Sequence, residues 1–199
     1  MSSTARTRSD GVATVRPVDD FYRTPAWATR AILPHLPAAG SVLDPCAGDG
    51  AIIQALLDGG FGGLVDAMEI DGERAAAIPG ADVLVCDALT EGEDFWAIPH
   101  ALVVMNPPFR LALRFVERAL DAQDGHRGTT AALLRLGMLA SQARASFWRA
   151  APADVYVLPR RPSFTGGGTD SADYAWFVWG PGRGGRWQVL DVESARGLR

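Results

Sequence analysis

A short apolar strand, a glycine-rich turn and an apolar helix follow one another without interruption in this chain. The strand pattern covers residues 41–44, the turn covers residues 45–50, and the helical pattern begins at Ala51 and ends before Gly59 and Gly60. This succession is typical of the first unit of a nucleotide-binding sheet, where glycines let the backbone approach a ligand. It predicts an α/β fold with a mostly parallel sheet.

Acidic residues flank the glycine-rich turn. Asp44 precedes Pro45-Cys46-Ala47-Gly48, and Asp49 stands between Gly48 and Gly50. Carboxylates at a phosphate-binding turn would repel the phosphates. The turn therefore favours a ligand that carries an amine or a sulfonium group and has no phosphate there.

Polar residues also follow the next two strand patterns. Glu69 comes after residues 63–68, nineteen positions beyond Gly50, a spacing that suits hydrogen bonds from ribose hydroxyls. Asp87 comes after residues 81–86 and can accept a hydrogen bond from an adenine amino group. Taken alone, each acid is typical of a helix cap or a solvated strand end. We expect Asp71, two residues after Glu69, to cap the helix that begins there. Their succession at strand ends favours a ligand site.

The run Asn106-Pro107-Pro108-Phe109 follows the buried strand pattern of residues 101–105. The prolines end the strand because neither can donate a ladder hydrogen bond. Asn106 offers a side-chain carbonyl, Pro107 a backbone carbonyl and Phe109 an aromatic face, which together suit an amino group on a flat ring. A strand-ending turn with a core phenylalanine explains the same four residues, and they leave both interpretations open.

Composition predicts one soluble, cytoplasmic domain. The 199 residues are 48% hydrophobic and 21% charged, enough to bury one sizeable core. Residues 1–20 lack hydrophobic periodicity and are expected to form a flexible tail before a single domain at residues 21–199. The sequence shows no apolar signal core and no membrane-spanning run. Two cysteines and three scattered histidines predict neither a disulfide framework nor a metal site.

The charge is unevenly distributed, although the net charge is only −4. Residues 41–100 carry one arginine against twelve acids, whereas residues 101–199 carry thirteen arginines against eight acids. This asymmetry indicates an acidic half that meets a cationic or hydroxyl-rich ligand and an arginine-bearing half that can meet phosphates.

The other segments complete an α/β pattern. Thr24 as N-cap and Pro25 as first residue predict a helix ending near residues 34–37. A helix at 111–120, which would carry Arg110 on the same face as two further arginines, precedes a strand at 129–134, a helix at 139–150 and a strand at 154–158. Residues 174–179 form the last strand pattern, predicting an antiparallel pair near the C-terminus. We expect residues 180–199 to be an edge extension and a tail.

A basic, glycine-rich loop joins the last two predicted strands. It contains Arg160, Arg161, three consecutive glycines and Phe164, which we expect to be exposed. Arginine pairs with phosphate and aromatic rings stack on unpaired bases, so the loop is a candidate for substrate contact. An ordinary hairpin loop is the alternative.

The ordered set formed by residues 44–50, 68–71, 86–88 and 106–109 resembles the motifs of class I S-adenosylmethionine-dependent amino-methyltransferases, especially DNA adenine-N6 methyltransferases. Phe21-Tyr22-x-Thr24-Pro25 resembles the N-terminal cofactor motif of one subgroup. The resemblance covers roughly residues 21–179, and its strength lies in the order of the motifs. It implies a Rossmann-like fold with one antiparallel strand near the C-terminus.

The resemblance also implies site residues and S-adenosylmethionine as the cofactor. Asn106, Pro107, Pro108 and Phe109 would form the catalytic set, and Asn106 would also contact the cofactor. Arg110, Arg160, Arg161 and Phe164 would contact the substrate. The remaining implied cofactor contacts are Phe21, Tyr22, Thr24, Asp44, Cys46, Gly48, Gly50, Glu69, Asp87 and Ala88.

The chain departs from sequence-specific DNA methyltransferases of this subgroup because it has no room for a separate target-recognition region after Phe109. It resembles the compact kind that phages and mobile elements carry, and DNA is the expected partner. Its loops, a partner subunit or a second copy would then read the target. Two alternatives stay open: methylation of RNA or of a protein glutamine, and a cofactor-binding subunit without catalysis.

Overall fold

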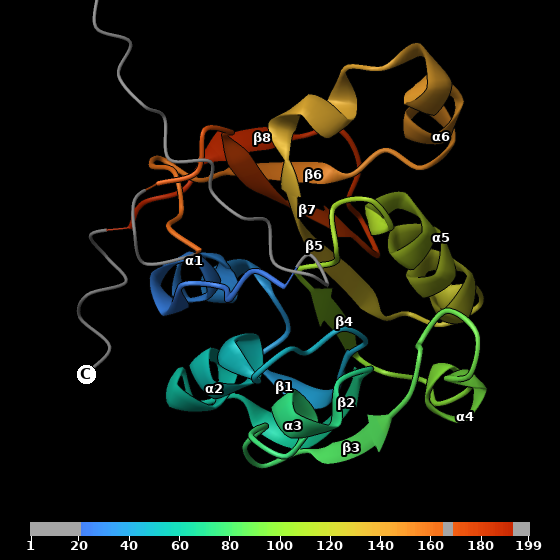
Figure 1. The fold of residues 1–199 in the computed structure, drawn as a ribbon. Helices are drawn as coiled ribbons and strands as arrows, with labels where there is room; N and C mark the ends of the chain where they lie inside the picture. The colour runs from blue at the N-terminus through green and yellow to red at the C-terminus, as the bar shows by residue number, and fades with distance from the viewer. Residues whose placement is uncertain (1–20, 165–168, 193–199) are drawn as a thin grey trace, which may run out of the picture.

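The computed structural model describes residues 21–164 and 169–192, which form an eight-stranded sheet with helices on both faces (Figure 1). The predicted tail at residues 1–20 lies outside these ranges. The strand order is β3-β2-β1-β4-β5-β7-β6-β8. The strands are β1 (Ala39–Asp44), β2 (Gly62–Glu69), β3 (Asp82–Val85), β4 (Leu102–Met105), β5 (Thr129–Arg135), β6 (Asp154–Val157), β7 (Tyr174–Trp179) and β8 (Trp187–Val189).

Among the strands of residues 21–164 and 169–192, only β7 runs against the others. It pairs antiparallel with β5 and with β6, whereas the remaining neighbours pair in parallel. The predicted mostly parallel sheet with one antiparallel strand near the C-terminus is confirmed. The predicted edge extension contains β8, which pairs with β6 at the end of the sheet.

Helices lie on both faces of the sheet (Figure 1). The α-helices are α1 (Ala26–Ile32), α2 (Ala51–Asp58), α3 (Gly72–Ala75), α4 (Glu93–Trp96), α5 (Ala112–Gln123) and α6 (Ala145–Ala150). The 3₁₀ turns are Leu33–His35, Leu136–Leu139 and Gln142–Arg144. Among the described residues, no helix is long and apolar enough to cross a bilayer.

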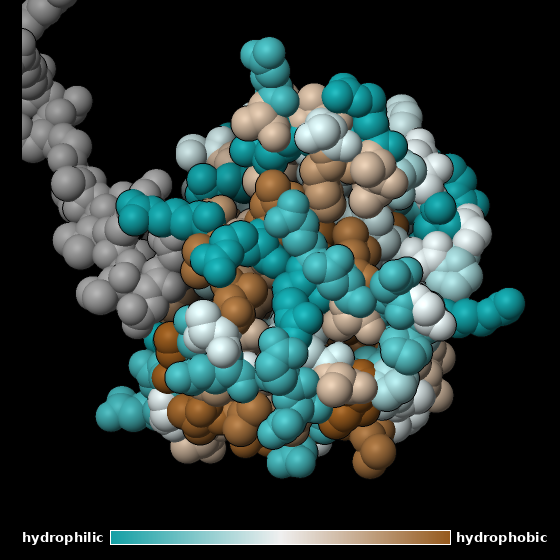
Figure 2. Space-filling view, turned by 90° about the vertical axis from the view of Figure 1, so that its right-hand side faces the viewer, coloured by the Kyte–Doolittle hydropathy of each residue, from teal (hydrophilic) through white to brown (hydrophobic). Residues whose placement is uncertain are grey.

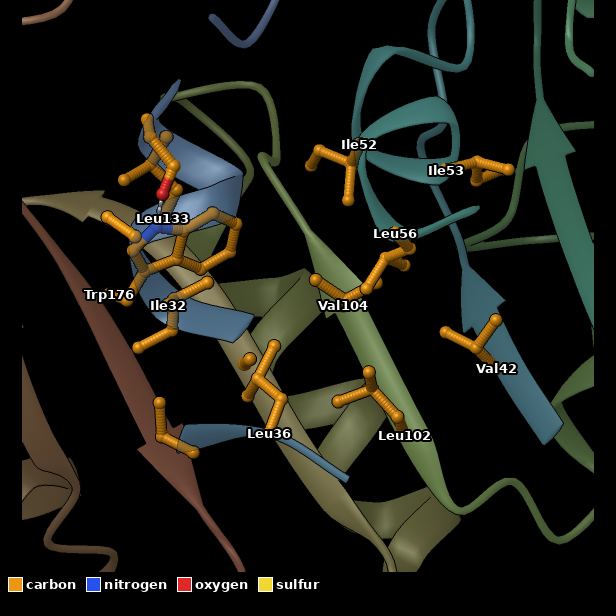
Figure 3. Packing of buried hydrophobic residues seen from close by; sticks show 14 of the residues in the cluster. Ile32, Leu36, Val42, Ile52, Ile53, Leu56, Leu102, Val104, Leu133 and Trp176 are labelled. Carbon is orange, nitrogen blue, oxygen red and sulfur yellow. Dashed lines mark hydrogen bonds between the residues drawn. The ribbon is translucent and has the colours of Figure 1, made fainter. Parts of the chain in front are cut away.

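The first core layer lies between α1, α2 and one face of the sheet (Figure 3). Ile32 of α1, Ile53 and Leu56 of α2, and Leu102 and Leu133 of the central strands are almost fully buried. Trp176 of β7 joins α1 to the sheet, because its ring nitrogen donates to the Ala28 carbonyl at 2.9 Å. This layer fixes the segment before α1 against the centre of the sheet.

The second core layer lies on the opposite face and packs against α4, α5 and α6. Phe115 and Val116 of α5 cover Val103 and Met105 of β4. Strand β4 is therefore buried on both faces, as its continuous apolar pattern predicts.

Two local predictions are wrong. Thr24 is not the N-cap of α1: Pro25 occupies that position, without a side-chain capping bond, and the Thr24 hydroxyl bonds Asn106 instead. The predicted helix at 139–150 is reduced to six residues, Ala145–Ala150, preceded by 3₁₀ turns. There Arg144 and Trp148 donate side-chain hydrogen bonds to the Met138 carbonyl, which stabilises the turn.

Candidate active site

A cavity of about 620 Å³ opens at the carboxyl ends of the central strands. Parallel strands present their carboxyl ends at one edge of the sheet, so residues that are distant in the sequence meet there. Nine of the predicted cofactor contacts line this cavity: Phe21, Tyr22, Thr24, Cys46, Gly48, Glu69, Asp87, Ala88 and Asn106. Asp44, at the end of β1, and Gly50, at the end of the turn, do not line it.

The glycine-rich turn adopts the left-handed conformation at two positions. Gly48 and Gly50 have φ values of 58° and 77°, which glycine reaches without steric cost. Gly50 is the N-cap of α2, and a side chain there would collide with Ile78 and Pro79. A Cβ atom on Gly48 would lie 2.4 Å from Phe21 Cε2. Phe21 therefore covers the turn directly.

Asp44 is buried at the end of β1 and is 1% exposed. Its Oδ1 accepts a hydrogen bond from the Cys46 amide at 3.2 Å, and its Oδ2 has no partner among the described residues. Burial, together with the nearby Glu69 charge, raises the pKa of Asp44 to about 8, despite the opposing Cys46 bond. The carboxyl group is therefore largely protonated at neutral pH. Burial also raises the pKa of the Cys46 thiol, which stays uncharged.

Glu69 holds the turn to the end of β2. Its Oε2 accepts from the Gly48 amide at 2.8 Å, and its Oε1 accepts from the Asp71 amide at 3.0 Å. Arg74 donates to the same Oε1 through Nε at 3.1 Å and Nη2 at 2.9 Å. The carboxylate that we expect to bind ribose hydroxyls thus faces the cavity with four donors already in place. Asp71 caps α3, as predicted.

The Asn106 amide lies at the end of β4 and is held by the segment before α1. Its Nδ2 donates to the Tyr22 carbonyl at 3.0 Å and to the Thr24 hydroxyl at 2.9 Å. Its Oδ1 is buried and has no hydrogen-bond partner among the described residues. The fold therefore aligns the amide and leaves one acceptor oxygen for a donor that the described residues do not supply.

Phe109 and Pro107 do not line the cavity, whereas Pro108 and Arg110 do. The Phe109 ring lies 4.8 Å from the Tyr22 ring, centroid to centroid, and the Arg135 guanidinium carbon lies 4.0 Å from the Phe109 centroid. The ring that we expect to stack on a target base thus already has aromatic and cationic partners in this structure, and the ring centroids of Phe164 and Tyr174 also lie 6.4 and 6.0 Å from its own.

The prediction that Phe164 is exposed is wrong. It is 9% exposed and meets the rings of Tyr22, Phe109 and Tyr174 edge-on, at 5.7, 6.4 and 5.1 Å. An aromatic side chain in a basic loop looks available in sequence, but here it closes the core beside the Asn-Pro-Pro-Phe run. We call Tyr22, Phe109, Arg135, Phe164 and Tyr174 the aromatic cluster.

Arg160 and Arg161 are exposed and lie apart from the cavity lining. Arg160 lies over the Trp27 ring at 4.3 Å, and Arg161 pairs with Asp173 at 2.8 Å. The three glycines of the predicted loop, at positions 166–168, lie outside the described residues. Of the predicted substrate-binding arginines, only Arg110 lines the cavity.

The face that carries α4, α5 and α6 is largely hydrophilic, with smaller hydrophobic patches between the polar residues (Figure 2). Arg118 of α5 pairs with Glu93 of α4 and lies over the Trp96 ring at 5.5 Å. Arg114 is exposed. This part of the arginine row covers the outer surface of α5 and does not converge on the cavity.

Three arginines at the site are not among the contacts predicted from the sequence, and the first, Arg23, lines the cavity and pairs with Asp49. Arg74 lines the cavity and binds Glu69, and Arg135 contacts Phe109. Arg135 is the last residue of β5, so its position at a strand's carboxyl end was an available signal. The signal for Arg74 was weaker, because the sequence does not indicate whether a side chain in the first turn of a short helix faces the cavity or the solvent. Among the described residues no group of His, Cys, Asp or Glu is arranged to hold a metal ion.

No protein-family model and no curated protein matches the sequence. Solved structures do match. A protein from Listeria monocytogenes assigned as a class I S-adenosylmethionine-dependent methyltransferase aligns with a TM-score of 0.58 and 13% identity, over 86% of this chain and 65% of that chain. The fold is that of the class I methyltransferases. This chain thus spans less than two thirds of the Listeria protein.

Two further structures have the same fold. An assigned RNA methyltransferase from Pyrococcus horikoshii gives a TM-score of 0.58 at 16% identity, over 80% of this chain and 84% of that chain. The 23S rRNA methyltransferase ErmE gives 0.58 at 18% identity, over 82% and 71%. At these identities the class I methyltransferase likeness establishes the architecture, and S-adenosylmethionine is the cofactor expected for it.

Proposed function

We propose that this chain is an S-adenosylmethionine-dependent methyltransferase that acts on the exocyclic amine of adenine in DNA. The observation that carries the proposal is the unpartnered Oδ1 of Asn106, buried at the wall of a large cavity. A buried carbonyl oxygen without a donor costs roughly 1–3 kcal/mol, so its retention points to a ligand that completes it. An amino group is such a donor.

The direction of the Asn106 amide follows from its partners. The Tyr22 carbonyl can only accept a hydrogen bond, so the Asn106 atom facing it at 3.0 Å must be the NH₂ nitrogen. The oxygen is then fixed on the other side. The hydrogen-bond partners thus determine the amide orientation, since the amide nitrogen and oxygen have nearly the same shape.

The residues present fit the expected cofactor. When bound, S-adenosylmethionine supplies an electrophilic methyl group on a positively charged sulfur. Asp49 Oδ1 at the turn is a second buried acceptor without a partner among the described residues, which suits the ammonium group of a methionine moiety. Glu69 and Asp87, at the ends of neighbouring strands, are the acceptors for ribose and adenine. The absence of basic side chains from the turn itself matches a ligand without phosphates.

Asn106 Oδ1 would accept a hydrogen bond from the target NH₂, and the Pro107 carbonyl would accept another. Two acceptors favour a pyramidal nitrogen whose lone pair can attack the methyl carbon. When bound, the cofactor would supply its methyl group to this nitrogen and keep the electron pair of the broken C–S bond on sulfur, and the extra proton on nitrogen would leave to water. Positioning and electrostatics would supply the acceleration, without a histidine or lysine base.

Support for a nucleic-acid target comes from the charge distribution and from flat-ring chemistry. Arg110 lies at the cavity, and Phe109 stands two positions after Pro107 in the same run. An adenine within a duplex would have to rotate out of the stack to reach Asn106, at a cost of a few kcal/mol. The arginines would contact phosphates on the flanking backbone.

The deciding experiment uses methyl-labelled S-adenosylmethionine with three separate acceptors: unmethylated DNA, total RNA and a protein extract. Each reaction is digested, and the labelled product is identified by mass spectrometry. Label in N6-methyladenine from DNA supports the proposal. If only RNA or protein glutamine is labelled, the methyl-transfer chemistry stands but the proposed DNA substrate is wrong. If no acceptor is labelled although the protein binds the cofactor, the result supports a non-catalytic subunit.

A further inference from the structure

Arg135 is the one charged side chain among the described residues whose guanidinium group lies over the Phe109 ring, and nothing in the motif set assigns it a role. Arg135 ends β5, the strand that neighbours β4 at the carboxyl edge of the sheet. It therefore lies beside the Asn-Pro-Pro-Phe run because of strand order, although 26 positions separate Arg135 from Phe109 in sequence. Its side chain keeps about 35% of its surface exposed.

Two partners fix the Arg135 guanidinium. Its Nε donates to the Tyr174 hydroxyl oxygen at 2.9 Å, and its Nη2 donates to Asp170 Oδ2 at 3.2 Å. The Tyr174 hydroxyl in turn donates to the same Asp170 oxygen at 2.6 Å. Three side chains from β5, β7 and the segment before β7 thus form a closed triangle. A guanidinium bonded at two nitrogens cannot rotate freely, so its plane is set.

Asp170 is itself held by the backbone. Its Oδ1 accepts from the Ala172 amide at 3.2 Å and from the Ser171 hydroxyl at 3.3 Å. These bonds, together with those from Arg135 and Tyr174, hold the pKa of Asp170 below its usual value, although burial opposes this shift. The triangle is therefore anchored to the sheet at β7 and to the turn before it.

The Phe109 ring contacts Phe164 and Tyr174 as well as Arg135 and Tyr22, and the last two are held in different ways. Arg135 is bonded into the sheet, whereas Tyr22 belongs to the segment before α1 and meets the ring at an interplanar angle of 30°. A cation over an aromatic face attracts the ring electrostatically, so Arg135 favours the observed orientation of the Phe109 ring.

We infer that Arg135 is a positioning residue for methyl transfer: braced by Tyr174 and Asp170, it holds the Phe109 ring in the plane that the flat target group stacks on. The inference rests on the proposed function and adds a residue to it. The target group takes the place of Tyr22 against the ring, while Arg135 remains. Arg135 acts through Phe109 and does not touch the transferred methyl group.

The first test requires no substrate. In the free wild-type protein, the Arg135 Nε–H signal in an arginine-selective ¹H–¹⁵N NMR spectrum should be shifted upfield by the Phe109 ring current and should show hindered rotation. Phe109→Leu should remove the shift, and Tyr174→Phe should restore rapid rotation. An Arg135 signal that resembles those of exposed arginines in the wild type overturns the inference.

The second test is a double-mutant cycle on methyl transfer, with the acceptor that the wild type labels. Arg135→Met should lower kcat/KM for that acceptor roughly tenfold to a hundredfold, the cost of a misplaced reacting group, while the cofactor dissociation constant is unchanged. In a Phe109→Leu background, Arg135→Met should cause no further loss, because its effect passes through the ring. A full additional loss in that background would show direct target contact and overturn the inference.

A matched control separates positioning from stability. Arg183 makes a similar arrangement elsewhere: it donates to the Tyr156 hydroxyl at 2.9 Å and lies 3.9 Å from Asp154. Arg183→Met removes a comparable partly buried arginine but leaves Phe109 untouched, so it should lower the unfolding temperature by a similar amount without changing kcat/KM. An equal loss of activity in both variants would reduce Arg135 to a structural role. Arg135→Lys keeps the positive charge but has no planar guanidinium group. Compared with Arg135→Met, it should restore the unfolding temperature but not kcat/KM.

The two proposals fail in distinguishable ways. If the wild type labels none of the acceptors, the proposed function fails, and the NMR experiment still decides whether Arg135 braces Phe109. If the wild type labels an acceptor and Arg135→Met works at the wild-type rate, the function stands and the inference about Arg135 is overturned.

Discussion

The two sides of this site are built differently. The cofactor side consists of the turns after β1, β2 and β3, and it surrounds an open cavity. The target side consists of the aromatic cluster, in which Phe109 and Phe164 pack against one another and against Tyr174. One side presents polar atoms at strand ends, and the other presents closed aromatic packing. Under the proposed function, the cofactor would enter a cavity that is already formed, whereas a target base would have to displace an aromatic neighbour of Phe109.

The hydrogen bonds follow the same division. At the cofactor side, Glu69 receives its donors from residues at most 21 positions away. At the target side, Asn106 is held by Tyr22 and Thr24, 84 and 82 positions away, and Arg135 is held from 35 and 39 positions away. The hydrogen bonds to Glu69 follow from the geometry of neighbouring strand-turn-helix units. The bonds that hold Asn106 and Arg135 form only when distant segments meet in the completed sheet.

The largest expected effect is at the junction of the two sides. Asn106→Ala should reduce kcat by roughly 10²–10³-fold, as for loss of one preorganised hydrogen-bonding group, with nearly unchanged cofactor affinity. Steady-state kinetics and calorimetry measure the two quantities. Thr24→Val is the graded comparison: it removes one of the two acceptors that align Asn106 and should give a smaller loss. Normal turnover in Asn106→Ala would exclude Asn106 from the mechanism.

Glu69→Gln probes the cofactor side alone. Hydrogen bonds to a charged group contribute about 1.5–3 kcal/mol, so the cofactor dissociation constant should rise by roughly ten- to a hundredfold. Asp71→Asn is the control, because Asp71 caps α3 at the same strand end through the Glu73 and Arg74 amides. Calorimetry should show weaker binding for Glu69→Gln only. Equal affinities for wild type and Glu69→Gln would contradict the assignment of Glu69 to the ribose.

Asp44 makes stability depend on pH at the cofactor side. The folded-state pKa of about 8 lies above the ordinary value of 3.8, so the folded protein binds the proton more tightly than the unfolded chain. Its contribution is fully present below the unfolded pKa and is lost as pH rises through the folded pKa. Between about pH 4 and 8 this loss approaches about 1.4 kcal/mol per pH unit.

Asp44→Asn tests that dependence, because asparagine mimics the protonated carboxyl group and keeps the acceptor for the Cys46 amide. Urea unfolding at pH 5, 6, 7 and 8 should show the wild type losing free energy of unfolding relative to the variant at each step. A constant difference across this range would mean that Asp44 does not titrate there.

The smallest effect is expected from the exposed loop. Arg160→Ala and Arg161→Ala should each raise KM for a nucleic-acid acceptor modestly, and the difference should vanish as salt rises, since exposed charges are screened. Anisotropy titrations with a labelled oligonucleotide at several salt concentrations measure this. A large, salt-independent effect of either variant would extend the target side beyond the aromatic cluster.

The cofactor side was predictable from sequence because its signals are local. The turn at residues 45–50, the cap at Asp71 and the acids Glu69 and Asp87 each follow a strand pattern directly. Parallel strands bring their carboxyl ends to one edge, so the cavity-lining residues that follow a strand could be expected to meet there, whereas Phe21, Tyr22 and Thr24 were implied only by the motif resemblance. The errors were also local, since Thr24 looks like a helix cap until a distant partner takes its hydroxyl.

By itself, the sequence determined an α/β chain with a parallel sheet, one reversed strand and an acidic ligand site at the strand ends. Tertiary structure alone decided that Phe164 is buried, that Arg135 covers Phe109, and that Asn106 keeps one oxygen without a partner. The physical reason is sequence distance. Periodicity and turn chemistry specify neighbours along the chain, whereas a side chain's partners across the sheet depend on strand order and packing, which no single segment encodes.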